Sequence, residues 1–310
     1  MDNELTTLAI LVGIAHSGIR LATPYLFAAL GETFAQRSGV LNLGVDGVML
    51  MGAFSAFYVV FNTESVWLGV GAALIVGALM GLLMAVVSVT LKAEQGISGI
   101  GLYLFGLGMS SLLFKTQIGS VESVQGFSAL HIPFLSELPI VGRIFFQHSM
   151  LVYLAYALVP VAAFVINHTT FGLKVRAVGH NPEAADSLGV NVNRVRYATL
   201  VIGSALAGLA GASLSIGLLN IFQENMTNGL GFIAVALVYF GGWRPVGVLM
   251  GALLFSTVNA LQLWVQVLGL PIPSDLAVMM PYVLTIVALA FAVRQIQQPA
   301  ALTKPYERGE

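Results

Sequence analysis

The stretch FGLKVRAVGHNPEAADSLGV, residues 171–190, decides how the chain is interpreted, because it is polar, clearly patterned and flanked on both sides by apolar sequence. Phe171, Val175 and Val178 are spaced to form one apolar stripe of a helix, and we expect Gly179 to end that helix. The sequence on both sides of the stretch is apolar enough to lie in a membrane. The stretch is therefore where the membrane-embedded part of the chain would contact a partner in the aqueous phase.

A second short helix is predicted directly after the first. Asn181 is a good N-cap, Pro182 fits the first helical position, Glu183 favours the positive helix end, and Gly189 would end the helix. Helices of about seven residues span roughly 10 Å, which is enough to dock on a partner and too little to cross a membrane. Small residues on one face would let a partner come close: Ala184, Ala185 and Leu188. The alternative is an ordinary, well-capped surface loop.

Composition independently predicts a multi-span membrane protein. Hydrophobic residues make up 57% of the chain and charged residues 9%, whereas a soluble domain has about 25% charged residues. The net charge of −1 provides no basic field for nucleic acid, and the absence of cysteine excludes disulfides and thiol chemistry. The first apolar segment is followed by many others, so we interpret it as a span and not as a signal peptide.

We predict one all-α transmembrane domain, residues 1–310, with about eight to ten membrane helices, some of them short or broken. The full spans are 5–19, 43–61, 67–91, 97–114, 149–167, 197–219, 246–267 and 277–293. Two apolar segments, 23–34 and 230–240, are shorter than the roughly 20 residues that a simple crossing needs. We expect the first to be tilted, half-buried or merged with its neighbour. The glycine-rich 197–219 span is expected to pack against helices on all sides.

Positive charge orients the chain, because basic residues concentrate on the cytoplasmic side. If the loop 168–196 is cytoplasmic, the same side holds most of the basic residues: Lys92, Lys174, Arg176, Arg194, Arg196, Arg244, Arg294, Lys304 and Arg308. The long connection 115–148, with Lys115 and Arg143, then lies outside as a folded loop.

Three stretches resemble a known family. RAVGHNPEAADSLGV, residues 176–190, resembles the cytoplasmic coupling loop of the ABC importer permeases that serve branched-chain amino acids, simple sugars and nucleosides. RLATPYLFAALGETFAQRSGVLNLGVDGVMLMGAF, residues 20–54, resembles the signature of the nucleoside and simple-sugar branch, and GGWRPVGVLMGAL, residues 241–253, is a weaker third match.

The resemblance implies a permease subunit in a bacterial cytoplasmic (inner) membrane that moves a nucleoside by alternating access. Simple sugars and branched-chain amino acids are alternative solutes. Family members pair two permeases, dock an ATPase on each, and receive substrate from an extracytoplasmic binding protein. We expect a heterodimer here, with a homodimer as the alternative. The docking positions carried over are Arg176, Ala177, Gly179, Asn181, Pro182, Ala184, Ala185 and Gly189.

Nothing in the sequence predicts catalysis by this chain. It contains no GxxxxGK[ST] phosphate-binding loop, so ATP hydrolysis is expected on the partner subunit. No cluster of histidines or acids has the spacing of a metal site, and we expect neither metal nor cofactor.

Five polar residues in apolar surroundings are candidates for the translocation path: Glu32, Asn42, Asp46, Asn259 and Gln262. Acids inside a membrane segment normally face other helices, a cavity or water. The alternative is that Glu32 and Asp46 cap helices near the aqueous edge, and that the Asn259 and Gln262 side chains hydrogen-bond a neighbouring helix. The competing functional class is a self-sufficient carrier that uses the acids as ion sites. A non-transporting scaffold is a third reading.

Overall fold

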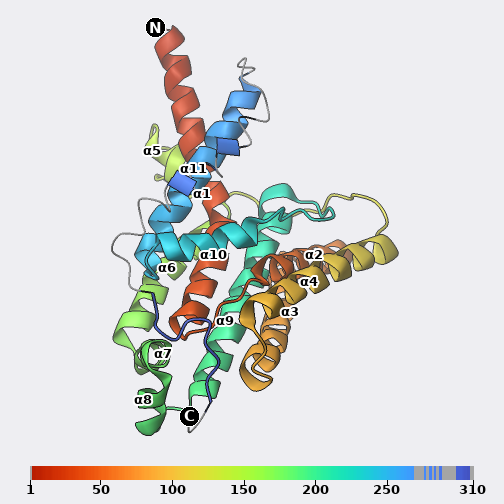
Figure 1. The fold of residues 1–310 in the computed structure, drawn as a ribbon. Coiled ribbons are helices and arrows are strands. Elements are labelled where there is room, and N and C mark those ends of the chain that lie inside the picture. Colours follow the sequence, from red (N-terminus) through yellow and green to blue (C-terminus); the bar gives the residue numbers. More distant parts are fainter. Residues whose placement is uncertain are drawn as a thin grey trace.

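The computed structural model describes residues 2–268 and 298–307, with isolated positions between 276 and 287. The described chain is helical throughout, apart from loops and two isolated β-bridges (Figure 1). Apart from those isolated positions, the predicted span 277–293 lies outside the described residues, as do the basic residues Arg294 and Arg308.

Seven described helices are long and apolar enough to cross a membrane, which confirms an all-α, multi-pass architecture. Two of the seven end in a π-helical turn, α3 with η1 and α9 with η2. The elements are α1 Asp2–Arg37, α2 Val45–Thr63, α3 Val66–Ala85, η1 Val86–Thr90, α4 Gln95–Gln117, α5 Val141–Phe145, α6 Met150–His168, α7 Thr170–His180, α8 Pro182–Ser187, α9 Val192–Ala212, η2 Ser213–Leu219, α10 Leu230–Phe240 and α11 Pro245–Val267.

The first two predicted apolar segments form one helix. α1 runs for 36 residues and continues through Pro24, which is tolerated because neighbouring helices can compensate for a proline in a membrane helix. The merger that the short length of 23–34 suggested is thus confirmed. α10, at 11 residues, stays as short as predicted.

Helix α9 is the central packing element. A side chain at Gly203 would collide with Gly31 of α1, one at Gly208 with Ala73 of α3, and one at Gly211 with Met49 of α2. The predicted helix with close neighbours on several sides is confirmed, and Figure 1 shows α9 between α1 and the α2–α4 group. The backbones touch because glycine puts nothing between them.

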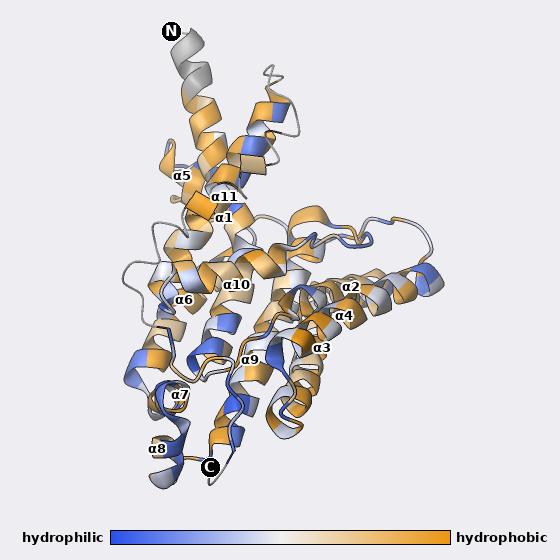
Figure 2. Cartoon of the chain, in the orientation of Figure 1, coloured by the Kyte–Doolittle hydropathy of each residue, from blue (hydrophilic) through white to orange (hydrophobic). Residues whose placement is uncertain are grey.

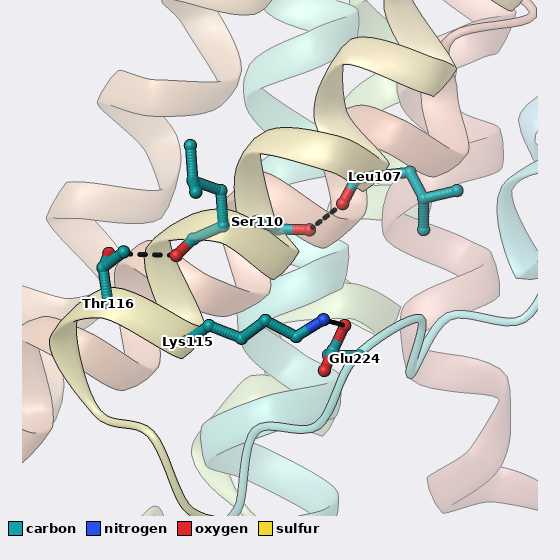
Figure 3. Close-up of polar contacts among 6 residues, drawn as sticks. Leu107, Ser110, Lys115, Thr116 and Glu224 are labelled. Carbon is teal, nitrogen blue, oxygen red and sulfur yellow. Dashed lines mark hydrogen bonds and ion pairs between the residues drawn. The ribbon is translucent and has the colours of Figure 1, made fainter.

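The two ends of the bundle differ in polarity. Hydrophilic residues gather on α7, α8 and the adjoining part of α9 (Figure 2). Near this end Lys92 pairs with Glu307 at 2.6 Å, and at the far end of α4 Lys115 pairs with Glu224 at 3.1 Å (Figure 3). The α7–α8 end is the one that the sequence predicts to be cytoplasmic, and its orientation in the membrane stays a prediction.

The long loop between α4 and α6 is folded against the helices. The N–H groups of Val124 and Phe127 donate to carbonyl oxygens of Asn220 and Ile216, both at 2.9 Å. The ring of His148 stacks on His16 of α1 with centroids 4.4 Å apart. Burial lowers the pKa of His148, and the buried position therefore favours the neutral form of its imidazole.

The glycine contacts of α9 can be tested by replacing one tightly packed glycine and one glycine without close neighbours by alanine. Gly208→Ala places a methyl group against the Ala73 carbonyl, and overpacking of this kind costs about 1–3 kcal/mol. Gly71→Ala on α3 meets nothing within 4 Å and gains helix propensity. We expect Gly208→Ala, and not Gly71→Ala, to lower the unfolding temperature of the detergent-purified protein. Equal temperatures for the two variants would contradict the packing described.

Candidate functional site

Residues 38–44, here called the break, separate α1 from α2 and lie beside the first turns of α4. A side chain at Gly99 of α4 would meet Leu43, and one at Gly44 would meet Leu102. The break is therefore non-helical backbone that is largely buried among the helices. Its N–H and C=O groups need partners within the protein, because apolar surroundings offer none.

Buried side chains supply those partners. Glu32 Oε1 accepts from the Asn42 N–H at 3.0 Å and from Gln36 Nε2 at 3.0 Å. Asn42 Oδ1 accepts from the Gly44 N–H at 2.9 Å, and Gln95 Oε1 accepts from the Leu41 N–H at 2.8 Å. The structure thus brings Glu32 and Asn42 together, and both serve the backbone of the break.

Asp46 makes a second, separate connection. It lies in the first turn of α2 and is 0% exposed. Its Oδ1 accepts from the Gly231 N–H at 2.7 Å and its Oδ2 from Thr227 Oγ1 at 3.0 Å. Asp46 therefore caps the positive end of α10, a helix far away in sequence, and does so away from solvent.

Asn259 and Gln262 are half-buried on α11. Neither side chain makes a hydrogen bond within the part of the chain that the structure describes. Their role in a path, and that of Glu32, Asn42 and Asp46, stays a prediction.

The two predicted short helices are confirmed as α7 and α8. We call them the coupling helices, after the role that the resemblance implies. Asn181 caps α8 by accepting the Ala184 N–H at 2.9 Å. After α8, the Val190 N–H donates to Ala185 O at 3.0 Å and the Gly189 N–H to Asp186 O at 2.8 Å. Gly189 has φ of +83°, so this is the glycine-dependent Schellman ending that the sequence predicts.

The predicted role of Gly179 is wrong. It does not end α7, which continues to His180. A Cβ at position 179 would instead collide with the carbonyl oxygen of Arg37, the last residue of α1. Glycine is needed here because α7 lies against the end of α1, a contact that no local pattern reveals.

The carried-over docking residues divide between two faces. Gly179 and Ala185 are buried, and Ala185 joins an apolar cluster with Val175, Val178, Val192 and Val195. Asn181, Ala184 and Gly189 are exposed, and Leu188 is 85% exposed. Arg176, Ala177 and Pro182 are intermediate. The expected common face of Ala184, Ala185 and Leu188 is therefore wrong, because Ala185 points inward.

The three stretches singled out in the sequence meet at the end of α1. Arg37 Nε donates to the Trp243 carbonyl at 2.8 Å, and Trp243 Nε1 donates to Gln36 Oε1 at 2.8 Å. With Gly179 against Arg37, all three stretches contact one helix turn.

Sequence reasoning missed several residues of this region: Gln36, Gln95, Arg196, Thr227 and Trp243. Gln36 could have been found, because it follows Glu32 by four residues and must share its helix face. Trp243 lies within residues 241–253, the weakest of the three stretches that resemble the family. Local sequence carries no signal for Gln95, Arg196 and Thr227, because their partners are distant in the chain.

Among the described residues no group of three or more metal-ligating side chains occurs. The arrangement is suited to holding helices and docking a partner: a capped, partly exposed helix pair is fixed to α1 and α9.

Comparisons with known proteins agree with this architecture. The family model described as "Branched-chain amino acid transport system / permease component" matches residues 14–289. The chain is 38% identical to a putative glucose ABC transporter permease protein, TsgC13, of Haloferax volcanii, over 96% of this chain and 98% of that one. No solved structure matches the chain.

Two relatives come from one bacterium, Bacillus subtilis. The chain is 35% identical to its guanosine ABC transporter permease protein NupQ, over 93% of this chain and 94% of that one. It is 28% identical to the guanosine ABC transporter permease protein NupP, over 89% and 81%. Because the family model covers most of its length, the chain belongs to this family of permease components of ABC importers.

Proposed function

We propose that the chain carries a nucleoside across the bacterial cytoplasmic membrane by alternating access, powered by a separate ATPase subunit that docks on α7 and α8. The observation that carries this proposal is the coupling-helix pair, with an exposed Leu188 on one side and Gly179 against α1 on the other. The chain itself is not an enzyme in this proposal, because ATP is hydrolysed on the partner.

The packing offers a route for movement. Gly179 touches the end of α1, and Ala185 shares an apolar cluster with Val192 and Val195 of α9. A displacement of α8 would therefore reach α1 and α9 together. Both helices also contact each other through Gly31 and Gly203, so they would move as one body.

A nucleoside is favoured as substrate by the guanosine transporters among the relatives. The relative named for glucose supports a simple sugar as the second candidate, and the family description leaves branched-chain amino acids as a third. Guanosine and glucose both carry a hydroxylated sugar ring, which limits the chemistry that a shared path must accept.

The break is the proposed border of the path. In this proposal Glu32, Asn42 and Asp46 hold the break and the start of α10 in place, and Asn259 and Gln262 face the solute from α11. The loop 115–148 and the α9–α10 connection lie on the outer side, where an extracytoplasmic binding protein would deliver the solute. The loop 168–196 lies in the cytoplasm.

A heterodimer is the proposed assembly. NupQ and NupP are two different permeases with one named substrate in one bacterium, and this chain is more similar to NupQ. A homodimer is the alternative, and the mass of the purified complex separates the two.

The substrate proposal predicts uptake. Removing this chain from its host should abolish uptake of radiolabelled guanosine and adenosine, and restoring it should return both, while glucose and leucine uptake stay unchanged. Loss of glucose uptake with unchanged nucleoside uptake would move the proposal to the sugar candidate.

Two substitutions on the coupling helices should have different effects. Ala184→Trp adds bulk on an exposed position, so we expect ATP-driven uptake to be lost while the unfolding temperature is unchanged. Gly179→Ala collides with Arg37 O, so it should lower both uptake and unfolding temperature. Ala184→Ser is the control and should transport normally. Normal uptake by Ala184→Trp would refute docking on this face.

Asp46 distinguishes the importer from an ion-coupled carrier. Asp46→Ala leaves the Gly231 N–H and Thr227 hydroxyl without their acceptor, at a cost of about 1–3 kcal/mol for each buried group. We expect a lower unfolding temperature for this variant and near-normal uptake for Asp46→Asn, which keeps one acceptor oxygen. A stable Asp46→Asn protein without uptake, together with uptake that stops when the proton gradient collapses, would favour the carrier.

A further inference from the structure

Residues 298–307, here called the return segment, run back to the coupling helices. The Ala301 N–H donates to Gly179 O at 2.9 Å, and the Thr303 N–H donates to Gly39 O at 3.2 Å. In Figure 1 this dark blue stretch passes between α7 and the adjoining part of α9. The return segment is thus tied by backbone hydrogen bonds to α7 and to the break.

Arg196 of α9 fixes the same segment from the other side. Its side chain is 1% exposed, its Nε donates to Ser38 O at 3.3 Å, and its Nη1 donates to Lys304 O at 3.0 Å. A buried guanidinium needs acceptors, because leaving water without them is costly. The Lys304 carbonyl is therefore part of what allows Arg196 to be buried.

Two more side chains extend the attachment. Tyr306 packs against the apolar cluster of Val175, Val178 and Ala185, and Glu307 pairs with Lys92 beyond η1. Ten residues therefore contact α7, α9, the break and the turn after η1. Nothing in the local sequence of this polar stretch predicts such contacts.

The return segment and the start of α8 enclose a cleft of about 590 Å³ that is open to solvent. One wall contains His180, Pro182 and Glu183, and the other contains Ala300, Lys304 and Pro305. The cleft is continuous with the exposed side of α8, which carries Asn181 and Ala184.

We propose that the return segment is the second wall of the ATPase-binding surface, so that the ATPase subunit occupies this cleft and contacts α8 and residues 298–307 together. The proposal rests on the proposed docking of an ATPase on α8 and extends it. The continuity of the cleft with the outward face of α8 favours this occupant. Force on one wall reaches α1 through Gly179, and force on the other reaches α9 through Arg196.

Site-specific crosslinking tests the contact, and the chain is well suited to it because it contains no cysteine. Leu188→Cys places a thiol on the exposed end of α8, Pro305→Cys places one on the return segment, and Val121→Cys places one on the exposed outer loop. Each variant is assembled with its native partners, treated with a short thiol-to-amine crosslinker in the membrane, and analysed by mass spectrometry.

We expect Leu188→Cys and Pro305→Cys to be joined to the ATPase, and Val121→Cys not to be. An ATPase adduct at position 188 without one at 305 would overturn this inference and leave the proposed function intact. Absence of ATPase adducts at both positions would overturn both. An adduct at 305 with a protein other than the ATPase would also overturn the inference.

A substitution at Ala301 tests the connection to α7. Ala301→Pro removes the N–H that Gly179 O accepts. We expect Ala301→Pro to lower ATP-driven uptake and ATPase co-purification about fivefold, as loss of one hydrogen bond of about 1 kcal/mol would. Gly71→Ala on α3, which meets nothing within 4 Å, is the control and should match the unmodified chain. Equal values for the two variants, per amount of inserted protein, would overturn the inference.

Discussion

The structure depends on satisfying backbone groups where a helix is interrupted inside an apolar bundle. The break between α1 and α2 exposes N–H groups that water cannot reach, and Glu32, Asn42 and Gln95 accept them. Each acceptor belongs to a different part of the chain: α1, the break itself and α4. Polar side chains that would be costly in lipid are therefore tolerated because they replace a missing helical partner.

The end of α1 combines this constraint with a close contact to α7. Its last turn holds Gln36 and Arg37, which bind Trp243, and its final carbonyl lies against Gly179 of α7. The break begins at the next residue. Helix α1 consequently connects the buried polar residues around the break directly to α7, with no flexible linker between them.

Features set by neighbouring residues could be predicted, and features set by distant ones could not. Asn181 and Gly189 identify the ends of α8 because capping is local, and the glycines of α9 signal close packing wherever its neighbours come from. Gly179 was misassigned because its partner, Arg37, lies far away in the chain. Asp46 was expected at a helix start, yet the helix that it caps is α10, a pairing that only the fold creates.

The composition of the break also constrains the order of events during membrane insertion. Glu32 precedes the break and is present as soon as the break is synthesised, whereas Gln95, which accepts the Leu41 N–H, follows two helices later. Asn42 Nδ2 reaches Ser204 of α9 at 3.4 Å, later still. Until α4 has entered the membrane, part of this backbone has to remain hydrated or in contact with the insertion machinery. The hydrogen bonds of the break are therefore complete only once α4 and α9, which are made later, have packed against it.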